Sequence, residues 1–600
     1  MNERKTEIIT REYLEKSGYY SDYVSVEEQQ SDNPRIAKLL KQASKRGTSR
    51  GMPEFIISSD KFPNLIIVIE CKADTKKHIS TSLDRFDSYA CDGALLYASY
   101  LSKEFDVIAI GVSGESKSEI KIDCFLQLEK EPNHIEFGPK TILPFQDFYN
   151  LYIQTPEKFN VDYNNLLSYT QRLNKKLHQL KIKESQRSLL ISSILIALKN
   201  PAFISGYKKH KTAKQLTESL VQTVVYELDD SNIPKEKISN LTHAYTFIKT
   251  HTILSTKKDK LEDLISEIDQ EINGFISTYQ FFDTLGQFYI EFLRYANNDK
   301  GLGIVLTPPH ITELFAEIAL VNKDSIILDN CCGTGGFLIS CMKKMVDDCN
   351  GDSSKIAEVK NNQIIGIEYQ DDIYALAISN MILQDDGKSS IKNVNCFDIV
   401  NEIRNLHPNI GLLNPPYKSE KTDREELEFV INNLEMLEVG GTCISLIPIS
   451  CVLADKGENY RLKQKLMDHH TIEAVMSLPE DLFHNSKVGV ITCALVITAK
   501  IPHPNNKKTW LGYWRNDGFI KVKGKGRIDK KHKWQVIKDK WVSTFLNRDV
   551  EEGYSVKQIL NPEDEWCVEA YLKTDYSKID QNAFEKELRK YIAFDLTNKS

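Results

Sequence analysis

The sequence lacks the features that would place the protein in a membrane, in an oxidising compartment or around a structural zinc ion. Its most apolar run, residues 189–198, ends at Lys199 and is far too short to span a bilayer. The charged N-terminal residues 1–16 are typical of an amphipathic helix and not of a signal peptide. The 12 cysteines include no C-x-x-C pair and no His/Cys ligand spacing, so we expect neither a zinc site nor a disulfide framework. We therefore expect a reduced, cytoplasmic protein without a membrane partner.

The chain also lacks an excess of positive charge, since its formal net charge is −7. A nucleic-acid-binding protein of this composition needs basic residues that are concentrated locally or supplied by a partner. One such concentration exists at residues 521–534, KVKGKGRIDKKHKW. Two interpretations stay open for it, a solvated surface loop and a contact to DNA phosphates or to a partner protein.

No internal repeat or low-complexity segment is present, and 600 residues are too many for one core. The pattern predicts a multidomain α/β protein with four parts. Strand-like runs dominate residues 1–155, helical spacing dominates a connector at 156–296, and short aliphatic strands alternate with helices at 297–505. That alternation predicts a mostly parallel, doubly wound, Rossmann-like sheet, whereas residues 506–600 form a basic C-terminal segment that contacts a partner or DNA.

A glycine-rich turn lies in the third part, in the segment SIILDNCCGTGGFLIS at residues 325–340. Asp329 ends the strand, and Gly333 and Gly335 let the backbone approach a ligand without a Cβ in the way. The next strand, IIGIE, ends in Glu368, where a carboxylate can accept both hydroxyls of a ribose. Such turns also serve structure alone, but this combination suits S-adenosylmethionine (SAM), whose ammonium group Asp329 can bind.

A second motif, NPPY, occupies residues 414–417 directly after the strand IGLL. Its prolines hold the backbone extended and leave carbonyl groups without competing amide donors. If the Asn414 side-chain oxygen and the Pro415 carbonyl accept hydrogen bonds from the amine of a base, the nitrogen lone pair is freed for methyl transfer. Tyr417 offers a ring for stacking on a flipped base. No Pro-Cys dipeptide exists to support attack on cytosine C5.

The segments GLGIVLTPPHITELF, DNCCGTGGFL, GIEYQ, CFDIV and NPPY, in this order, resemble the N6-adenine DNA methyltransferases, and above all the modification subunits of type I restriction systems. The resemblance implies that Thr307 and Pro308 line the methionine end of SAM, that Glu368 binds the ribose and that Asp398 contacts the cofactor adenine. One departure is Asn330, where the family usually has proline. Methylation of cytosine N4 uses a similar motif and stays open.

The N-terminal part holds a second candidate site, because GMPEFII at residues 51–57 precedes LIIVIECKAD at 65–74. Two strands with a tight connection place Glu54 and Glu70 together, with Lys72 on the same face as Glu70. Two carboxylates bind Mg²⁺, which lowers the pKa of a bound water, while Lys72 orients or activates the nucleophile. This resembles the PD-(D/E)xK nucleases, with glutamate at position 54 where aspartate is commoner. A surface Glu–Lys pair or an inactive nuclease fold is the alternative.

Together these parts resemble fused restriction-modification enzymes of type IIG and, more closely, type IIB. The resemblance implies an adenine methyltransferase and Mg²⁺-dependent endonuclease acting on double-stranded DNA. Only about a hundred residues follow the methyltransferase core, so it also implies a separate specificity subunit in a hetero-oligomer. Two alternatives remain, a methyltransferase with a structural or inactive N-terminal domain, and a non-catalytic protein that senses SAM or methylated DNA.

Overall fold

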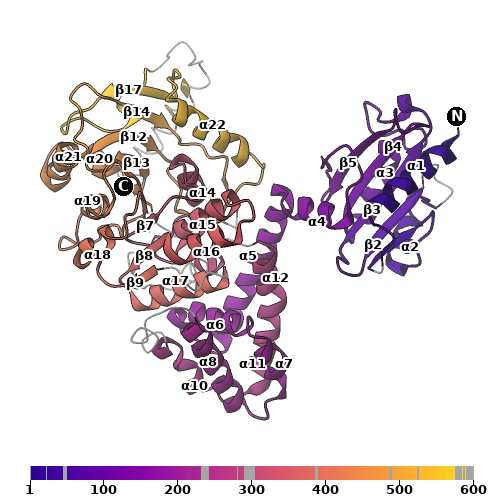
Figure 1. Ribbon diagram of the computed structural model, residues 1–600, viewed down its shortest axis with the longest axis horizontal. Coiled ribbons are helices and arrows are strands. Elements are labelled where there is room, and N and C mark those ends of the chain that lie inside the picture. The colour runs from indigo at the N-terminus through magenta and orange to yellow at the C-terminus, as the bar shows by residue number, and fades with distance from the viewer. Residues whose placement is uncertain are drawn as a thin grey trace. The chain divides into compact units, whose positions relative to one another are not determined.

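The computed structural model describes most of the chain as two compact units, residues 1–163 and 164–600 (Figure 1). The described residues are 2–21, 23–44, 50–230, 242–279, 282–288, 305–384, 390–484, 489–522, 526–573, 581, 584, 585, 588 and 589. Gly301, at the start of the predicted methyltransferase motifs, and Lys523 and Lys525 of the basic stretch lie outside them.

The first unit is built on a six-stranded sheet whose strands follow one another in chain order. Its strands are β1 (Val24–Glu27), β2 (Phe55–Ser59), β3 (Leu65–Lys72), β4 (Asp106–Ser113), β5 (Lys121–Gln127) and β6 (Ile135–Glu136). Only β3 and β4 pair in parallel, and the other neighbours are antiparallel. The strands predicted near residues 54–58, 65–70, 106–112 and 120–124 are confirmed.

Helices cover both faces of this sheet, which explains why β3 and β4 are apolar along almost their whole length. The helices are α1 (Glu3–Lys16), α2 (Pro34–Leu40), the 3₁₀ turn η1 (Thr75–Lys77), α3 (Ala90–Leu101) and α4 (Phe145–Ile153). One hydrophobic core includes Leu14 of α1 and Phe148 of α4, and the other includes Leu39 of α2 and Ala94 of α3. The sheet is therefore buried on both sides, so the few polar residues inside it lie among apolar side chains.

The chain continues with helices, the first of which begins in the first unit and ends in the second. They are α5 (Pro156–Gln179), α6 (Glu184–Ala197), α7 (Pro201–Gly206), η2 (Tyr207–Lys209), α8 (Ala213–Asp230), α10 (Phe247–Thr250), α11 (Lys258–Ile268), the π-helical turn η3 (Asp269–Asn273) and α12 (Gly274–Thr278). Figure 1 shows α6 beside α17 (Asp371–Leu383), and Tyr245 reaches across to Ser379 of α17 with 2.8 Å between the two hydroxyl oxygens. This contact fixes the helical segment to the following sheet domain.

Within the described residues, no single helix is both long and apolar enough to cross a membrane, and only the pair Glu184–Ala197 and Pro201–Lys209, bent by 92°, meets those criteria jointly.

A nine-stranded sheet forms the rest of the second unit, in the order β17-β14-β12-β13-β11-β10-β7-β8-β9. Its strands are β7 (Ile327–Asp329), β8 (Ile364–Glu368), β9 (Ser390–Asn393), β10 (Ile410–Leu413), β11 (Thr442–Pro448), β12 (Thr471–Ser477), β13 (Thr492–Thr498), β14 (Lys508–Tyr513) and β17 (Ser555–Ile559). The run from β11 to β9 is parallel, while β13 is antiparallel to both its neighbours. The predicted mostly parallel sheet is confirmed, and β14 and β17 extend it past residue 505.

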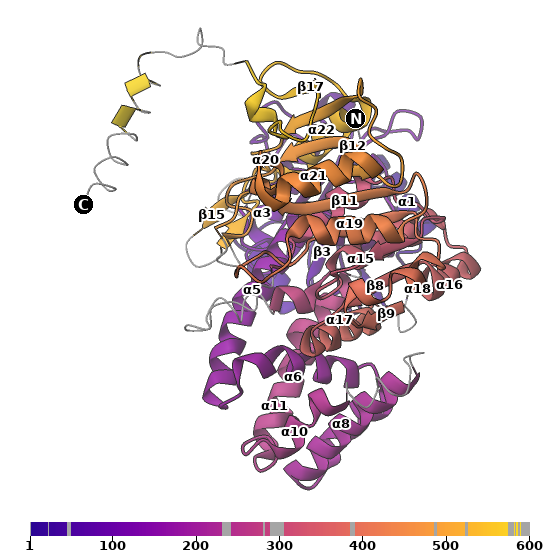
Figure 2. The same ribbon diagram turned by 90° about the vertical axis from the view of Figure 1, so that its left-hand side faces the viewer.

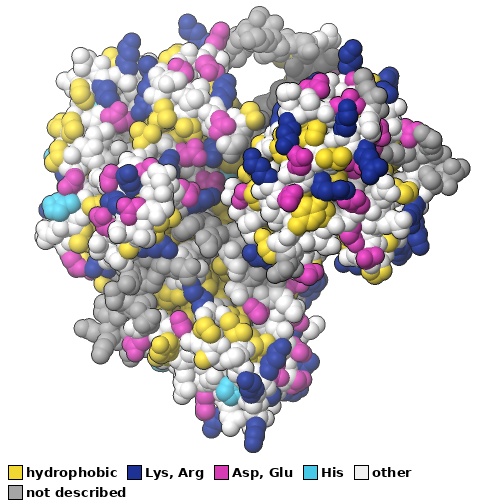
Figure 3. All heavy atoms as spheres, turned by 45° about the vertical axis from the view of Figure 1, so that its right-hand side comes forward, with side chains coloured by type: hydrophobic (Ala, Val, Ile, Leu, Met, Phe, Trp, Pro, Cys, Tyr) yellow, Lys and Arg dark blue, Asp and Glu magenta, His cyan; other side chains and the backbone are white. Residues whose placement is uncertain are grey.

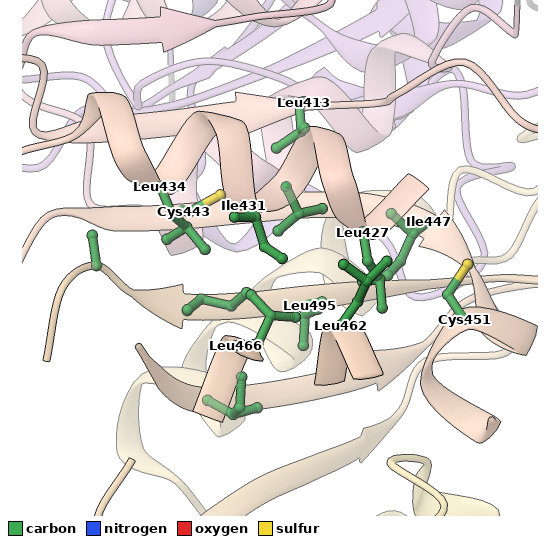
Figure 4. Close-up of a cluster of buried hydrophobic side chains, with 14 of the residues drawn as sticks. Leu413, Leu427, Ile431, Leu434, Cys443, Ile447, Cys451, Leu462, Leu466 and Leu495 are labelled. Atoms are coloured by element: carbon green, nitrogen blue, oxygen red, sulfur yellow. The ribbon is translucent and has the colours of Figure 1, made fainter. Parts of the chain in front are cut away.

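Helices lie on both faces of this sheet, and α19 runs along one of them (Figure 2). They are α14 (Pro309–Ile318), α15 (Gly336–Asp348), α16 (Ser353–Asn362), α17, η4 (Cys396–Asp398), α18 (Val400–Arg404), α19 (Glu426–Met436), α20 (Ile449–Leu453), α21 (Gly457–His469), α22 (Trp534–Asn547) and η6 (Val568–Ala570). Leu427, Ile431 and Leu434 of α19 pack into a core with Leu413 of β10 and Cys443 of β11 (Figure 4). This packing fixes the end of β10, where the NPPY segment begins.

The basic stretch forms a small hairpin, β15 (Ile520–Val522) and β16 (Gly526–Ile528), followed by α22. Part of its charge is neutralised within the chain. Arg527 makes two 2.6 Å hydrogen bonds to buried Asp517, and Lys538 lies 2.6 Å from the Glu317 carboxylate of α14. The hairpin and α22 are thus part of the folded unit and are joined to α14.

Candidate active site

The glycine-rich turn after β7 has a backbone that other residues rarely adopt. Gly333 and Gly335 have φ angles of 53° and 89°, and Gly335 is the N-cap of α15. The amide of Cys331 donates a 3.0 Å hydrogen bond to Asp329, and the amide of Gly333 donates a 3.1 Å bond to Glu368. The turn is therefore folded over the two carboxylates that end β7 and β8.

Strand order brings the predicted residues together, because β10, β7 and β8 are parallel neighbours and their carboxyl ends share one edge. A pocket at this edge is lined by Asp283, Val305, Leu306, Thr307, Asp329, Cys331, Cys332, Gly333, Thr334, Gly336, Phe337 and Asn414. Four of the predicted site residues, Thr307, Asp329, Gly333 and Asn414, thus line one pocket.

Other predicted residues lie around the pocket without lining it. Pro308 precedes α14, Gly335 precedes α15, and Glu368 contacts the turn through the Gly333 amide. Asp398 ends η4 as an exposed residue. The structure therefore places Asp398 at the surface.

Three buried carboxylates lie in or beside the pocket. Asp329 is only 1% exposed, and burial raises its pKa to about 8, with the charge of Glu368 adding to the rise. Burial also raises the pKa of Glu368 and that of Asp283. Because these buried carboxylates are costly to ionise on their own, a ligand with positive charge is favoured there.

Asp283 is a pocket residue that the sequence did not reveal. Its carboxylate accepts hydrogen bonds from Thr334, Asn380 and the amide of Gly286, at 2.8, 2.5 and 2.7 Å. A Cβ at position 286 would lie 2.2 Å from this carboxylate, so only glycine fits. An aspartate three residues before a glycine in an apolar segment is the signal that would have indicated this turn.

The side chain of Asn414 is fixed in one orientation. Its amide nitrogen lies 2.7 Å from the Val305 carbonyl oxygen and 3.1 Å from the Thr307 hydroxyl. A carbonyl only accepts hydrogen bonds, so the group facing Val305 must be the NH₂. The Asn414 Oδ1 atom is buried and has no hydrogen-bond partner among the described residues. An oriented and unused acceptor therefore lies beside the pocket.

The remaining residues of NPPY follow in an extended segment. Pro415 is buried, and the ring of Tyr417 meets Phe483 edge-on, with centroids 6.0 Å apart. The Tyr417 hydroxyl is buried without a partner among the described residues, and burial raises its pKa well above the usual value. Packing, and not a hydrogen bond, thus holds this ring in place.

The N-terminal candidate residues also converge. The antiparallel pairing of β2 with β3 brings Glu54 next to β3, where its carboxylate accepts a 3.2 Å bond from the Cys71 amide. Glu70 is fully buried, and Lys72 Nζ lies 2.9 Å from its Oε1 and 3.4 Å from Glu3. The structure therefore brings Glu54, Glu70 and Lys72 to one place, with a buried Glu–Lys ion pair at its centre.

Comparison with known proteins identifies the methylase part. A family model described as N-6 DNA methylase matches residues 280–599. The chain belongs to the N-6 DNA methylase family. The type II restriction enzyme and methyltransferase RM.BcgI of Heyndrickxia coagulans is 30% identical, over 99% of this chain and 97% of that protein. The MpnII methylase subunit, a type I restriction enzyme component of Mycoplasma pneumoniae, is 26% identical over 42% of this chain and 50% of that one.

Among solved structures, one from work on complex assembly and conformational transition of the type I R-M system is 16% identical, with a TM-score of 0.50. It covers 72% of this chain and 97% of that chain, and it shows a shared fold. The predicted class, a SAM-dependent N6-adenine methyltransferase of restriction-modification systems, is confirmed at the level of the family. The resemblance to fused restriction-modification enzymes is confirmed as well.

In this N-6 DNA methylase, Asn330 takes the place where proline is usual. Its amide nitrogen donates to the Phe429 carbonyl at 3.1 Å and to Asn432 at 2.9 Å, and Asn433 donates to its oxygen at 3.0 Å. These buried bonds tie the glycine-rich turn to α19. The asparagine thus replaces the stiffness of a proline ring with a hydrogen-bonded anchor.

Proposed function

We propose that the chain methylates adenine N6 in DNA with SAM, cleaves unmodified DNA with Mg²⁺, and reads its target with a separate specificity subunit. The assignment of the methyltransferase residues rests on Asn414 Oδ1, which is buried beside the acidic pocket and has no hydrogen-bond partner among the described residues. An acceptor held there by Val305 and Thr307 is suited to accept a hydrogen bond from the amine of a base.

The side chains around the pocket have the charges and acceptor groups that SAM requires. When bound, SAM supplies an electrophilic methyl group on a positively charged sulfonium, beside a second positive charge on its ammonium. Asp329 is the residue we assign to the ammonium, and Glu368 is assigned to the ribose hydroxyls. Thr307 and Pro308 border the methionine end, and Asp398 is assigned to the adenine amine. The raised pKa of Asp329 agrees with a site that is completed by a cation.

The target amine is bound by the NPPY segment. Asn414 Oδ1 and the Pro415 carbonyl each accept a hydrogen bond from the amine, which reduces delocalisation of the nitrogen lone pair into the ring. Tyr417 contributes a ring face to the flipped base, at a cost of a few kcal/mol for unstacking the base from the duplex. These residues thus activate the amine as the nucleophile. The attack on the methyl group needs no side chain that acts as an acid or a base.

Incubation of the full chain and its co-purified target-recognition protein with DNA and labelled SAM, followed by nucleoside analysis, tests this assignment. We expect N6-methyladenine as the product, and we expect Asn414→Ala to abolish it. N4-methylcytosine as the product would contradict the choice of base. Unchanged transfer by the Asn414→Ala protein would contradict the site, and the absence of transfer by wild-type protein under all conditions would favour a SAM or methyl-DNA sensor.

For the N-terminal unit we propose a PD-(D/E)xK-type nuclease centre, in which Glu54 and Glu70 hold Mg²⁺. When bound, Mg²⁺ supplies a Lewis acid that lowers the pKa of a coordinated water. Lys72 lies 2.9 Å from Glu70, close enough to orient that water. The support is the convergence of these three side chains in a buried sheet, together with similarity along the whole chain to a protein named as a restriction enzyme and methyltransferase. A structural N-terminal domain is the alternative, and Mg²⁺-dependent cleavage abolished by Lys72→Ala decides between them.

A separate specificity subunit is proposed because the chain carries little positive charge to spare for DNA. On the face shown in Figure 3, Lys and Arg side chains of the described residues are interspersed with Asp and Glu. Several basic groups after residue 505 are paired internally, as for Lys538 with Glu317. We expect the chain to co-purify with a target-recognition protein and to need it for both activities. Site-specific methylation by the chain alone would overturn this part of the proposal.

A further inference from the structure

A compact group of metal-ligating atoms lies in the first unit, outside the proposed nuclease centre. His78 Nε2, Cys91 Sγ and an Asp123 carboxylate oxygen all lie within 4.8 Å of one another. The His78 ring nitrogen is 2.8 Å from Asp123 Oδ2 and 3.7 Å from Cys91 Sγ. His78 and Cys91 are 4% and 0% exposed, and the Asp123 side chain is 26% exposed. The three ligand atoms are therefore close enough together to hold one metal ion.

We infer that His78, Cys91 and Asp123 bind a transition metal ion of the zinc type, at a site distinct from the proposed Mg²⁺ site. A nitrogen, a sulfur and an oxygen ligand form a donor set that Zn²⁺ accepts and that Mg²⁺, which prefers oxygen alone, does not. With the thiol and the carboxylic acid deprotonated, the ligands carry two negative charges, which balance a divalent ion. A water can complete the tetrahedral set.

The His78 ring is oriented so that one of its nitrogens faces the other two ligands. Asp123 Oδ2 and Cys91 Sγ both approach Nε2, and a bound ion would take the place of a hydrogen on that nitrogen. The other nitrogen, Nδ1, lies 2.8 Å from the hydroxyl of buried Ser113. A hydrogen bond from the second ring nitrogen is the usual outer contact of a metal-bound histidine, and it fixes the ring with Nε2 toward the metal.

The sheet provides space for the thiol. Gly111 of β4 pairs in register with Glu70 of β3 on one side and with Asp123 of β5 on the other. A Cβ at position 111 would lie 2.5 Å from Cys91 Sγ, so only glycine leaves room for this side chain. Cys91 is also the second residue of α3, which places its thiol on the first turn of that helix.

The segment that carries His78 is held against α3 by other bonds. Asp92 of α3 accepts hydrogen bonds from the amides of Ser80 and Arg85, at 3.1 and 2.9 Å, and from the Ser80 hydroxyl. The Cys91 amide donates to the His78 carbonyl at 2.9 Å. Two of the three ligands are therefore positioned before any metal arrives, which reduces the entropy lost on binding.

The inferred role of the metal is to fasten the loop that leads from Lys72 to α3. The same helical turn lies over Glu70, since a Cβ at Gly93 would be 3.0 Å from Glu70 Cγ. The metal would thus fix the helix end that covers the proposed nuclease carboxylate. The three ligands are far apart in the sequence, on a loop, a helix and a strand, so spacing rules for zinc sites predict none here.

The test is the metal content of the full-length chain, purified without a metal-binding tag, incubated with Zn²⁺ and dialysed. We expect about one tightly held zinc per chain, and Cys91→Ser and His78→Gln each to lower that content at least about tenfold. Cys124→Ser is the matched control, because Cys124 is a buried thiol next to Asp123 on β5 but packs into the opposite core. It should keep the wild-type metal content.

Cobalt substitution gives a readout that needs no variant. Co²⁺ bound to wild-type protein should show a thiolate-to-metal charge-transfer band, and Cys91→Ser should lack it. The inference is wrong if wild-type protein retains no zinc, if bound Co²⁺ shows no thiolate band, or if Cys91→Ser keeps its metal. Methyl transfer by each variant reports that the second unit is folded. If Lys72→Ala keeps the wild-type zinc content, the zinc site is independent of the proposed nuclease activity.

Discussion

Asp329 in the methylase unit and Glu70 in the first unit are both buried carboxylates near the end of a strand, but their neighbours differ. The charged group that acts on Asp329 is a second carboxylate, Glu368, and the pKa of Asp329 rises to about 8. Glu70 instead has Lys72 at 2.9 Å. The raised pKa of Asp329 favours the cationic ligand that we propose, whereas Glu70 already has a cation beside it, which the proposed Mg²⁺ would have to share or displace.

This difference predicts that the two units can be inactivated separately, which is the largest effect we expect. Asn414→Ala should lower methyl transfer about 10³-fold, because it removes the oriented acceptor, and leave cleavage intact. Lys72→Ala should lower cleavage at least about 10²-fold and leave methyl transfer intact. Both activities are measured on one DNA substrate with any required partner present.

Exposed residues of the same type serve as controls, Asn405→Ala and Lys77→Ala. If either active-site variant loses both activities while its melting temperature is unchanged, the two sites depend on each other and the comparison fails.

The next effect concerns Asp329→Asn, which should weaken SAM binding about 10²-fold by removing the partner of the ammonium group. It should also stabilise the cofactor-free protein. The folded pKa near 8 exceeds the unfolded value of 3.8, so the folded state holds the proton and loses stability as the pH rises through this range. Asparagine has no such proton to lose.

The melting temperature of Asp329→Asn, measured without SAM, should therefore exceed that of wild type more at about pH 8 than at about pH 5. Isothermal titration with SAM gives the affinity. If the difference in melting temperature stays constant or narrows as the pH rises, Asp329 is ionised in the free protein. The raised pKa that we assign to Asp329 is then wrong.

The sequence predicted those parts of the site that lie at strand ends. The runs IIGIE and IGLL are short, apolar and followed by polar residues, so both the strands and the positions of Glu368 and Asn414 were predictable. Whether these residues act as proposed stays a prediction. The glycine turn was predictable for the same local reason, since positive φ angles at Gly333 and Gly335 require glycine.

Residues brought in from distant segments were not predictable. Asp283 reaches the pocket from a segment that precedes the sheet, and only the fold places it against Thr334. The same holds for the Cys91 thiol beside His78, and for β14 and β17, which join the sheet from a region without a clear pattern. Contacts of this kind depend on packing between elements, which local periodicity does not encode.

A moderate effect is expected at Asn330, which links the cofactor turn to α19. Asn330→Pro should destabilise the second unit by about 2–4 kcal/mol, because it leaves buried groups of Asn432 and Asn433 without their partner. Thermal unfolding measures the loss. Adding Asn433→Leu should recover part of it, since both partners of one bond are then absent. Purely additive losses would show that the two side chains do not interact.

The smallest effect is expected at Tyr417, where ring and hydroxyl can be tested separately. The hydroxyl is buried without a partner among the described residues, so Tyr417→Phe removes a group that was costly to bury. We expect it to change stability by less than about 1 kcal/mol, toward higher stability, and to leave methyl transfer within about twofold of wild type. Tyr417→Ala removes the ring that meets Phe483 and should lower the transfer rate strongly. A large loss in Tyr417→Phe would mean that the hydroxyl gains a partner when DNA binds, and the ring would then not be the only part of Tyr417 that contacts the base.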